Sequence, residues 1–293
     1  MKRVLLTTAA LMAAVAVSSL VSLPSKPLIL VTTWRDGAVA GAIHVHTNRS
    51  DGSRSPEDVA AAAARAGLQF VIFTDHGDAT RAPDPPVYRA GVLCLDGVEI
   101  STTGGHYVAI GLPQAPYRLG GEPRDVVEDV RRLGGFGIAA HPDSPKPELQ
   151  WGGWSAPFDG IELINPDSSW RAHASSPGWR PKLGLARALT TFPFRGAETI
   201  ARLLKDSPET VRRWAALTSE RPVVGLAGVD AHARLELRSG DPADNRFALP
   251  IPGYEASFRV LSVRVSVGEP LSGEPAADAK RLLDSLRSGR VYT

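Results

Sequence analysis

The chain has 293 residues, of which 43% are hydrophobic and 22% are charged, and its formal net charge is +2. These fractions are ordinary for a globular protein, so they exclude intrinsic disorder, a collagen-like repeat and a coiled coil. Basic residues are scattered and form no run longer than a pair such as Arg131-Arg132, so we expect no dedicated nucleic-acid surface. The single cysteine, Cys94, excludes an internal disulfide, a cysteine-rich zinc site and an iron–sulfur cluster, and its apolar neighbours are typical of a buried strand.

Residues 1–36 have the pattern of an export segment followed by a linker. Lys2 and Arg3 precede an uncharged apolar stretch that runs from Val4 to Leu23. A basic start and an apolar middle are typical of a signal peptide, and about 20 apolar residues would also suffice for a membrane anchor. Both alternatives place the remainder outside the cytoplasm, where it is either secreted or periplasmic, or associated with the cytoplasmic membrane through this segment.

Beyond residue 36, expected strands and helices alternate along the chain. Strands are expected at residues 42–46, 70–73, 92–95, 107–112, 137–140, 160–164 and 223–227. Helices are expected at residues 56–66, 124–133, 198–205 and 208–217. This alternation favours an α/β fold with a mainly parallel sheet or barrel.

The main domain is expected to span residues 37–250. Residues 251–293 would form a C-terminal extension packed on it, with strand pattern over 256–267 and an amphipathic helix over 275–288. The last residues, 290–293, begin a further strand that either pairs back on the barrel or leads into another domain.

Histidines and carboxylates gather where the expected strands end. His44 and His46 close the first strand and lie two residues apart, which places them on the same face. Asp51 follows the same strand, and similar residues follow later strands, namely His76, Glu99, His141, Asp230 and His232. In (β/α) barrels the loops at the carboxyl ends of the strands converge on one mouth. Because imidazole and carboxylate together suit zinc, manganese or iron, the pattern predicts a metal site at this mouth.

These residues stand in motifs that resemble the PHP (polymerase and histidinol phosphatase) family of metal-dependent phosphoesterases. The motifs occur in the family's order and are His44-Val45-His46, Thr74-Asp75-His76, Gly97-Val98-Glu99-Ile100, His141-Pro142 and Asp230-Ala231-His232. The resemblance covers residues 40–235 and implies a distorted (β/α)7 barrel with two to three divalent metal ions (Zn, Mn or Fe) at its C-terminal rim. Gly160–Asn165 also resembles a branch of the family that includes extracytoplasmic metallohydrolases and a carbamate-ester hydrolase.

The resemblance also implies a set of metal ligands. The ligands of the first metal would be His44, His46, Glu99 and Asp230. Glu99 would bridge to a second metal bound by His106 and His141. The ligands of a third metal would be Asp51, His76 and His232. Some family members carry a histidine one place after Asp51, where this chain has Gly52. Catalytic roles within this set are assigned to Glu99, His141, Asp230 and His232.

The charge of such a site indicates the kind of substrate it would bind. Three divalent ions with three carboxylate ligands leave an excess of about three positive charges, which favours an anion such as a phosphate ester. Bound metals also lower the pKa of water towards about 7. We therefore predict a metal-dependent hydrolase whose partner is a small phosphorylated substrate, a phosphomonoester or phosphodiester, attacked by a hydroxide held between the metals.

Other functions remain open from the sequence. The same ligands would serve a hydrolase of carboxylic or carbamate esters, which only the substrate loops would distinguish from a phosphoesterase. A non-catalytic metal-binding module is a further alternative, but such a module is expected to lose ligands, and this chain retains nine of them. A membrane-associated structural protein would rest on the N-terminal segment alone.

Four further residues are expected near the site with weaker support. Asp75 is a candidate for orienting an imidazole or is a turn residue, and Arg49 is a candidate phosphate contact or a solvated arginine. Glu162 and Asn165 would border the site if the branch resemblance holds. The segment Trp151–Arg180 carries four of the six tryptophans and is expected either to shape the substrate pocket or to pack as a loop.

Overall fold

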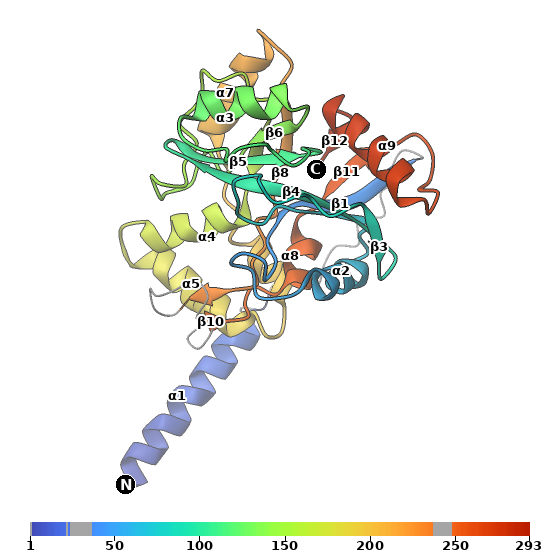
Figure 1. The fold of residues 1–293 in the computed structure, drawn as a ribbon. Coiled ribbons are helices and arrows are strands. Elements are labelled where there is room, and N and C mark those ends of the chain that lie inside the picture. Colours follow the sequence, from blue (N-terminus) through green and yellow to red (C-terminus); the bar gives the residue numbers. More distant parts are fainter. Residues whose placement is uncertain (1, 22, 24–36, 237–247) are drawn as a thin grey trace.

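The computed structural model describes residues 2–21, 23, 37–236 and 248–293. Helix α1 (Lys2–Val21) covers the expected export segment and extends from the rest of the chain as one long helix (Figure 1). Among the described residues, no helix combines the length and the apolar character needed to cross a membrane. The expected linker over residues 24–36 lies outside the described residues.

Seven strands form a barrel-like sheet in which they follow one another in chain order. They are β1 (Ala38–Val45), β2 (Phe70–Phe73), β4 (Val92–Thr102), β5 (Gly105–Ile110), β6 (Phe136–Ala139), β7 (Gly160–Ile164) and β8 (Val224–Ala227). The sheet closes because the segment after β8 pairs with the end of β1. Val45 and Ala231 form a parallel bridge there, and the Val229 N–H donates to the Ile43 carbonyl at 2.9 Å. The expected distorted (β/α)7 barrel is confirmed.

Strand β5 is the exception to the mainly parallel pattern within this barrel. It runs antiparallel to both β4 and β6, whereas the other neighbouring barrel strands pair in parallel. Only Thr103 and Gly104 separate β4 from β5, and a parallel connection would need a crossover of about a dozen residues or more. The hairpin therefore starts β5 at the carboxyl end of β4, next to the rim.

Helices cover the outside of the barrel (Figure 1). Helix α2 (Pro56–Arg65) follows β1 and α3 (Pro123–Arg132) follows β5, and the segment between β7 and β8 forms α4 (Pro166–Ser175), α5 (Trp179–Thr191), α6 (Gly196–Ala201) and α7 (Pro208–Thr218). The start of α2 is as expected, with the Ser55 side chain accepting a hydrogen bond from the Asp58 N–H. Helices α4 and α5 are additional to the expected elements. Asn165 begins α4 in the same way, its side chain accepting from the Ser168 N–H.

The C-terminal residues close the end of the barrel away from the rim. Strand β11 (Val263–Ser266) pairs antiparallel with the first half of β1, and β12 (Val291–Tyr292) pairs with β11 and lies against β8. The expected amphipathic helix is α9 (Pro275–Arg287), which buries Leu282 and Leu286 in the barrel's apolar core. The last strand therefore pairs back on the barrel.

The expected strand over residues 256–267 is wrong in its first half. Residues there form helix α8 (Tyr254–Val260), and only the second half forms β11. Tyr254 and Phe258 are buried four residues apart, so they share one helical face. Three short strands complete the described structure, namely β3 (Val87–Arg89), β9 (Leu235–Glu236) and β10 (Ala248–Leu249).

Candidate metal centre

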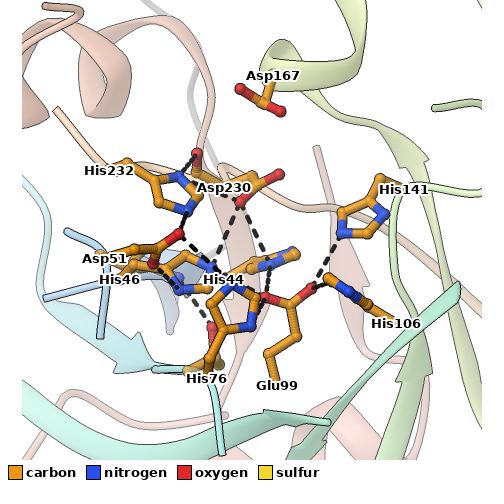
Figure 2. Close-up of polar contacts among 12 residues, drawn as sticks. His44, His46, Asp51, His76, Glu99, His106, His141, Asp167, Asp230 and His232 are labelled. Atoms are coloured by element: carbon orange, nitrogen blue, oxygen red, sulfur yellow. Dashed lines mark hydrogen bonds and ion pairs between the residues drawn. The ribbon is translucent and has the colours of Figure 1, made fainter. Parts of the chain in front are cut away.

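The nine side chains expected to bind metal converge at the carboxyl end of the barrel (Figure 2). Each comes from the end of a strand, from the β4–β5 hairpin or from the loop that follows a strand. In chain order they are His44, His46, Asp51, His76, Glu99, His106, His141, Asp230 and His232. The structure thus brings together residues as far apart in the sequence as His44 and His232, which are separated by 188 positions.

The most buried group of donor atoms comes from β1, β4 and the segment after β8. The Nε2 atoms of His44 and His46 lie 3.2 and 3.1 Å from Glu99 Oε2. The same nitrogens lie 3.4 and 3.5 Å from Asp230 Oδ1. Tetrahedral ligands about 2.1 Å from a zinc ion would lie about 3.4 Å from one another, so these spacings suit a divalent metal. Within the described residues both nitrogens are buried without a hydrogen-bond partner, as expected of imidazoles that face a metal position.

Glu99 belongs to two groups because its two carboxylate oxygens face different nitrogens. Oε2 faces His44 and His46, whereas Oε1 lies 2.9 Å from His106 Nδ1 and 3.0 Å from His141 Nε2. The β4–β5 hairpin makes this possible, since it places His106 on the strand next to Glu99. A carboxylate between two sets of nitrogen donors has the geometry of a bridging ligand.

A third group lies nearer the solvent. Asp51 Oδ2 lies 3.3 Å from His232 Nε2 and 3.6 Å from His76 Nε2. The side chains of Asp51 and His76 are 31% and 33% exposed, compared with 1% for Glu99. The donors can also be grouped differently, for example as His76 with Glu99 and His106, so the same nine side chains suit two or three ions.

The position after Asp51 has no room for a side chain. A Cβ atom at Gly52 would lie 2.5 Å from the His46 carbonyl oxygen and 2.7 Å from the Tyr254 hydroxyl. A histidine at this position, as in some PHP proteins, would therefore clash with the rim. The carboxylate of Asp51 is the donor that this loop supplies.

Glu162 orients the innermost histidine. Its Oε1 lies 2.5 Å from His44 Nδ1, and its Oε2 accepts a hydrogen bond from the His141 backbone N–H at 2.8 Å. Asn165 donates from its side chain to both Glu162 and Asp230, at 3.0 and 3.2 Å. A carboxylate on one imidazole nitrogen leaves the other nitrogen directed at the metal and fixes the ring. Gly228 is required beside it, because a Cβ there would lie 1.8 Å from Glu162 Oε1.

The orienting role expected for Asp75 is therefore taken by Glu162. The Asp75 carboxylate accepts hydrogen bonds from the Thr47 N–H and hydroxyl, at 2.7 and 2.8 Å, and from the Ser50 hydroxyl at 2.7 Å. These donors belong to the loop between β1 and Asp51. Asp75 thus positions the third group through the backbone of this loop rather than through an imidazole ring.

Tyr254, on helix α8, ties two ligand segments together and was not expected from the sequence. Its hydroxyl lies 2.9 Å from the His46 carbonyl and 3.0 Å from the His232 carbonyl, and it can donate to either. It also accepts from the Ser53 N–H at 3.2 Å. No local pattern marks this tyrosine, because its partners are far away in the sequence.

Three of the candidate ligands have backbone conformations in the left-handed region. His44, His141 and Asp230 have φ values of 65°, 27° and 49°. Such values are uncommon for residues other than glycine and cost on the order of 1–3 kcal/mol each. At His44 the pairing of β1 with β2 shifts by one residue, which is a bulge in β1. The strained residues of this rim are thus among those that carry its chemistry.

The buried charges of the cluster stabilise one another. Burial alone would lower the pKa of His141, but hydrogen bonding to Glu99 and the charges of Glu99 and Asp230 outweigh it and raise this pKa to about 9. Burial opposes ionisation of Glu99, yet His44, His106 and His141 hold its pKa well below the usual range. Divalent cations at the same positions would neutralise these carboxylates in place of the protons on the imidazoles.

Seven of the nine donors, all except His44 and His46, line a cavity of about 460 Å³. Its wall is completed by Asp167, Trp170 and Arg171 from the 151–180 segment and by four residues that the sequence did not point to, namely Lys146, Leu149, Arg234 and Leu235. Asp167, in the first turn of α4, faces the rim across this cavity (Figure 2). Its carboxylate accepts from Trp170 Nε1 at 2.8 Å and pairs with Arg171.

Arg49 is engaged in a charge network next to this cavity. Its guanidinium pairs with Asp84 and lies 3.1 Å from Asp96, and Arg81 pairs with the same two carboxylates. The two guanidinium groups and the two carboxylates neutralise one another. They hold Arg49 at the edge of a separate polar cavity, which His76 also lines. The phosphate contact considered for Arg49 has no support from these pairs.

The tryptophans of the 151–180 segment divide between the two expectations. Trp151 is buried and stacks on Tyr107, with ring centroids 5.4 Å apart, so it packs as part of the core. Trp170 lines the metal cavity. Trp179 is 67% exposed. The segment therefore both packs on the barrel and shapes the site.

Comparison with known proteins agrees with this geometry. Residues 42–107 match the family model described as PHP domain, and this segment includes six of the nine donors. The resemblance to the PHP family is confirmed for this segment. An uncharacterized protein of Methanocaldococcus jannaschii is 26% identical over an alignment of 137 residues, and the match covers 42% of this chain and 80% of that protein.

Two solved structures are similar in part. A two-domain protein from Bacteroides vulgatus, described as containing a predicted PHP-like metal-dependent phosphoesterase, has a TM-score of 0.47 at 16% identity, over 92% of this chain and 67% of that chain. A proposed metal-dependent phosphoesterase from Bifidobacterium adolescentis has a TM-score of 0.37 at 15% identity, over 66% of this chain and 87% of that chain. The PHP match and the clustered His, Asp and Glu donors together support a metal-dependent hydrolase.

Proposed function

We propose that this protein is a metal-dependent phosphoesterase that hydrolyses a phosphomonoester or a phosphodiester. The observation that carries the proposal is the position of Glu99, whose two oxygens face two separate sets of imidazole nitrogens. Sites that hold two divalent ions side by side are used by phosphatases and nucleases to stabilise the attacking and the leaving oxygen together.

The charges around the cavity also favour an anionic substrate. Glu162 and Asp167 raise the number of carboxylates at the site from three to five, so three divalent ions would leave an excess of about one positive charge. Lys146, Arg171 and Arg234 line the same cavity and add positive charge on its outer side. These cations border the space that a phosphate group would enter, and Arg171 also pairs with Asp167.

Each group of residues has a distinct part in this proposal. Bound divalent metals would supply hydroxide near neutral pH and neutralise charge that develops on phosphorus oxygens. Four candidate metal ligands that line the cavity would hold the metals next to the bound substrate, namely Glu99, His141, Asp230 and His232. Glu162 fixes the ring of His44, and Asn165 fixes both Glu162 and Asp230. Hydrolysis needs no protein nucleophile in this arrangement.

The N-terminal segment suggests where the enzyme works. The basic residues Lys2 and Arg3 and the apolar residues after them support export, so we place the barrel outside the cytoplasm as part of the same proposal. A fusion of residues 1–36 to a reporter that is active only after export tests this. Activity comparable with that of a known signal peptide is expected, and an inactive, fully cytoplasmic reporter would reject it.

The activity is tested with the full chain, loaded with manganese or zinc, on a phosphomonoester, a phosphodiester and a carboxylic ester that share one chromogenic leaving group. Metal-dependent cleavage of a phosphoester is expected. His44→Ala should abolish it, whereas His173→Ala, at a half-buried histidine of α4 outside the donor groups, should retain it. Cleavage of the carboxylic ester alone would reject the phosphoesterase and favour the carbon-ester hydrolase.

A further inference from the structure

A second cavity, of about 210 Å³, opens beside the metal cavity. Helices α4, α5 and α6 form one side of it, and residues 229–235 and 251–252 form the other. Most of the side chains that line it are apolar, among them Leu185, Phe192, Ile200, Leu203 and Ile251. We refer to it as the apolar cavity.

One face of α5 supplies a continuous apolar surface to this cavity. Leu185, Ala188, Leu189 and Phe192 are spaced by three and four residues, so they lie along one side of the helix. Leu189 remains 53% exposed, and Leu185 and Phe192 are only half-buried. Apolar side chains gathered around a hollow, and left uncovered by the residues that the structure describes, mark a binding site for an apolar group.

The apolar cavity and the metal cavity share part of their walls. The shared lining residues are Asp167, Trp170, Asp230, His232, Arg234 and Leu235. Two of these, Asp230 and His232, are candidate metal ligands. A molecule whose reacting group lies at the metal donors can therefore extend directly into the apolar cavity.

Trp170 stands at the boundary between the two cavities in a fixed position. Its indole N–H donates to Asp167 at 2.8 Å, and the Arg171 guanidinium lies over its ring, 4.7 Å from the centroid. These contacts hold the apolar ring between a charged chamber and an apolar one. The arrangement suits a ligand that is charged at one end and apolar at the other.

We propose that the substrate is an amphiphilic ester, in which the group next to the scissile ester is an apolar ring or chain of about six to eight carbon atoms bound in the apolar cavity. A dry cavity of about 150 Å³ can hold benzene, and the apolar cavity is somewhat larger. The ester at one end of this substrate rests on the proposed function, and the apolar group at the other end does not. The walls of the apolar cavity define the other end.

The test is the affinity of the full chain, loaded with zinc or manganese, for alkylphosphonic acids from methyl to octyl, measured by isothermal titration calorimetry. These compounds bind without turnover. If the apolar cavity receives the chain, the Kd should fall about fourfold per methylene, and should level off near hexyl or octyl when the cavity is full.

Two substitutions in α5 form a matched pair. Leu185→Asp introduces a charge into the apolar cavity and should remove the dependence of the Kd on chain length. Leu183→Asp, two residues away, alters a side chain that is 47% exposed and outside the cavity lining, so the dependence should remain. Leu203→Trp, which fills the cavity instead of charging it, should shorten the longest chain that still gains affinity.

Equal affinity along the whole series, or no binding even of octylphosphonic acid, would overturn the assignment. A dependence that appears only after removal of α1, which contacts α5, would mean that α1 fills the cavity and would overturn it as well. Release of the alkanol with phosphate from monoalkyl phosphates, and of the alkanol with methyl phosphate from methyl alkyl phosphodiesters, in the same preparation, tests the proposed function separately. Affinity that rises with chain length without turnover would reject the phosphoesterase alone.

Discussion

The two ends of the barrel are built in opposite ways. At the rim, strand ends present imidazoles and carboxylates to one another, and three of these residues have left-handed backbone conformations. At the other end, β11, β12 and α9 cover the barrel with apolar side chains such as Val263, Val265 and Leu282. The rim concentrates buried imidazoles and carboxylates that pair with one another, and the opposite end supplies the apolar burial that stabilises the fold.

Two buried carboxylates make the contrast concrete. Asp278, in α9, accepts from the backbone N–H groups of Ser272 and Gly273 at 2.9 Å each and from the Tyr88 hydroxyl at 2.6 Å, so the protein itself satisfies it. Glu99 faces five imidazole nitrogens, all from candidate metal ligands. One carboxylate is placed for stability and the other for chemistry.

The largest expected effect is at Glu99. Glu99→Gln removes a ligand from two donor groups at once, so bound metal should fall and the hydrolytic rate should drop by about a thousandfold or more, as expected when several kcal/mol of metal assistance are lost. Metal content by mass spectrometry and turnover measure this. Glu128→Gln, on the exposed side of α3, is the control and should change neither. Full metal content in Glu99→Gln would contradict the bridging role.

Substitutions at Glu162 and Asp75 compare the two carboxylates that could orient an imidazole. Glu162→Gln should weaken metal binding about 10- to 100-fold, because the ring of His44 loses its charged partner. Asp75→Asn acts on the loop from Thr47 to Ser50 and should affect the inner groups less. Metal titration of both variants measures the difference, and an equal loss of inner-site affinity would show that Glu162 has no special part.

A smaller effect is expected at Tyr254, which joins the C-terminal residues to the rim. Tyr254→Phe leaves the carbonyls of His46 and His232 without this donor, which should cost about 1 kcal/mol of unfolding free energy and a few-fold in metal affinity at the outer group. Tyr117→Phe, at a tyrosine that is 41% exposed, is the control. An unchanged outer site would place Tyr254 in packing alone.

The smallest effect on the metal centre is expected from Asp278→Asn, which should affect stability only. Burial opposes ionisation, but hydrogen bonds from Ser272, Tyr88 and Arg281 hold the pKa of Asp278 well below its usual range. Because the folded pKa lies below the unfolded value of about 3.9, this stabilisation is present above pH 4 and is lost as the pH falls.

Denaturant unfolding at several pH values measures the effect of Asp278→Asn. The variant should be less stable than the parent by about 1–3 kcal/mol at neutral pH, and the difference should shrink below pH 4. Asp284→Asn, on the exposed side of the same helix, should match the parent throughout. A constant difference between the two curves at all pH values would contradict the pKa argument.

Local sequence patterns predicted the strand ends and helix starts that depend on the spacing of nearby residues. His44, His76 and Asp230 could be placed at one mouth because each follows an apolar strand, and parallel strands end at the same edge. The start of α2 was also predictable from local sequence, because Ser55 followed by Pro56 is typical of the first residues of a helix. The reversal of β5 was not predicted, because the strands expected at residues 92–95 and 107–112 lie 11 residues apart, whereas β4 and β5 are separated by only Thr103 and Gly104.

Contacts between distant segments were beyond such reasoning. Glu162 and His44 are 118 residues apart, and Tyr254 and His46 are 208 residues apart, so no spacing rule links them. The first half of residues 256–267 was read as a strand, although Phe258 and Tyr254 pack from one face of a helix. Tertiary packing decided between the two patterns there.

The pairing of the first strand with the C-terminal segment has a consequence for synthesis of the chain. His46 emerges from the ribosome long before Tyr254, whose hydroxyl supports its backbone, and β1 emerges long before β11, which pairs with its first half. Translation at about 5–20 residues per second separates these events by about ten seconds or more. The rim therefore stays incomplete until Tyr254 and β11 have been made. A metal ion can bind to the completed site only after that point.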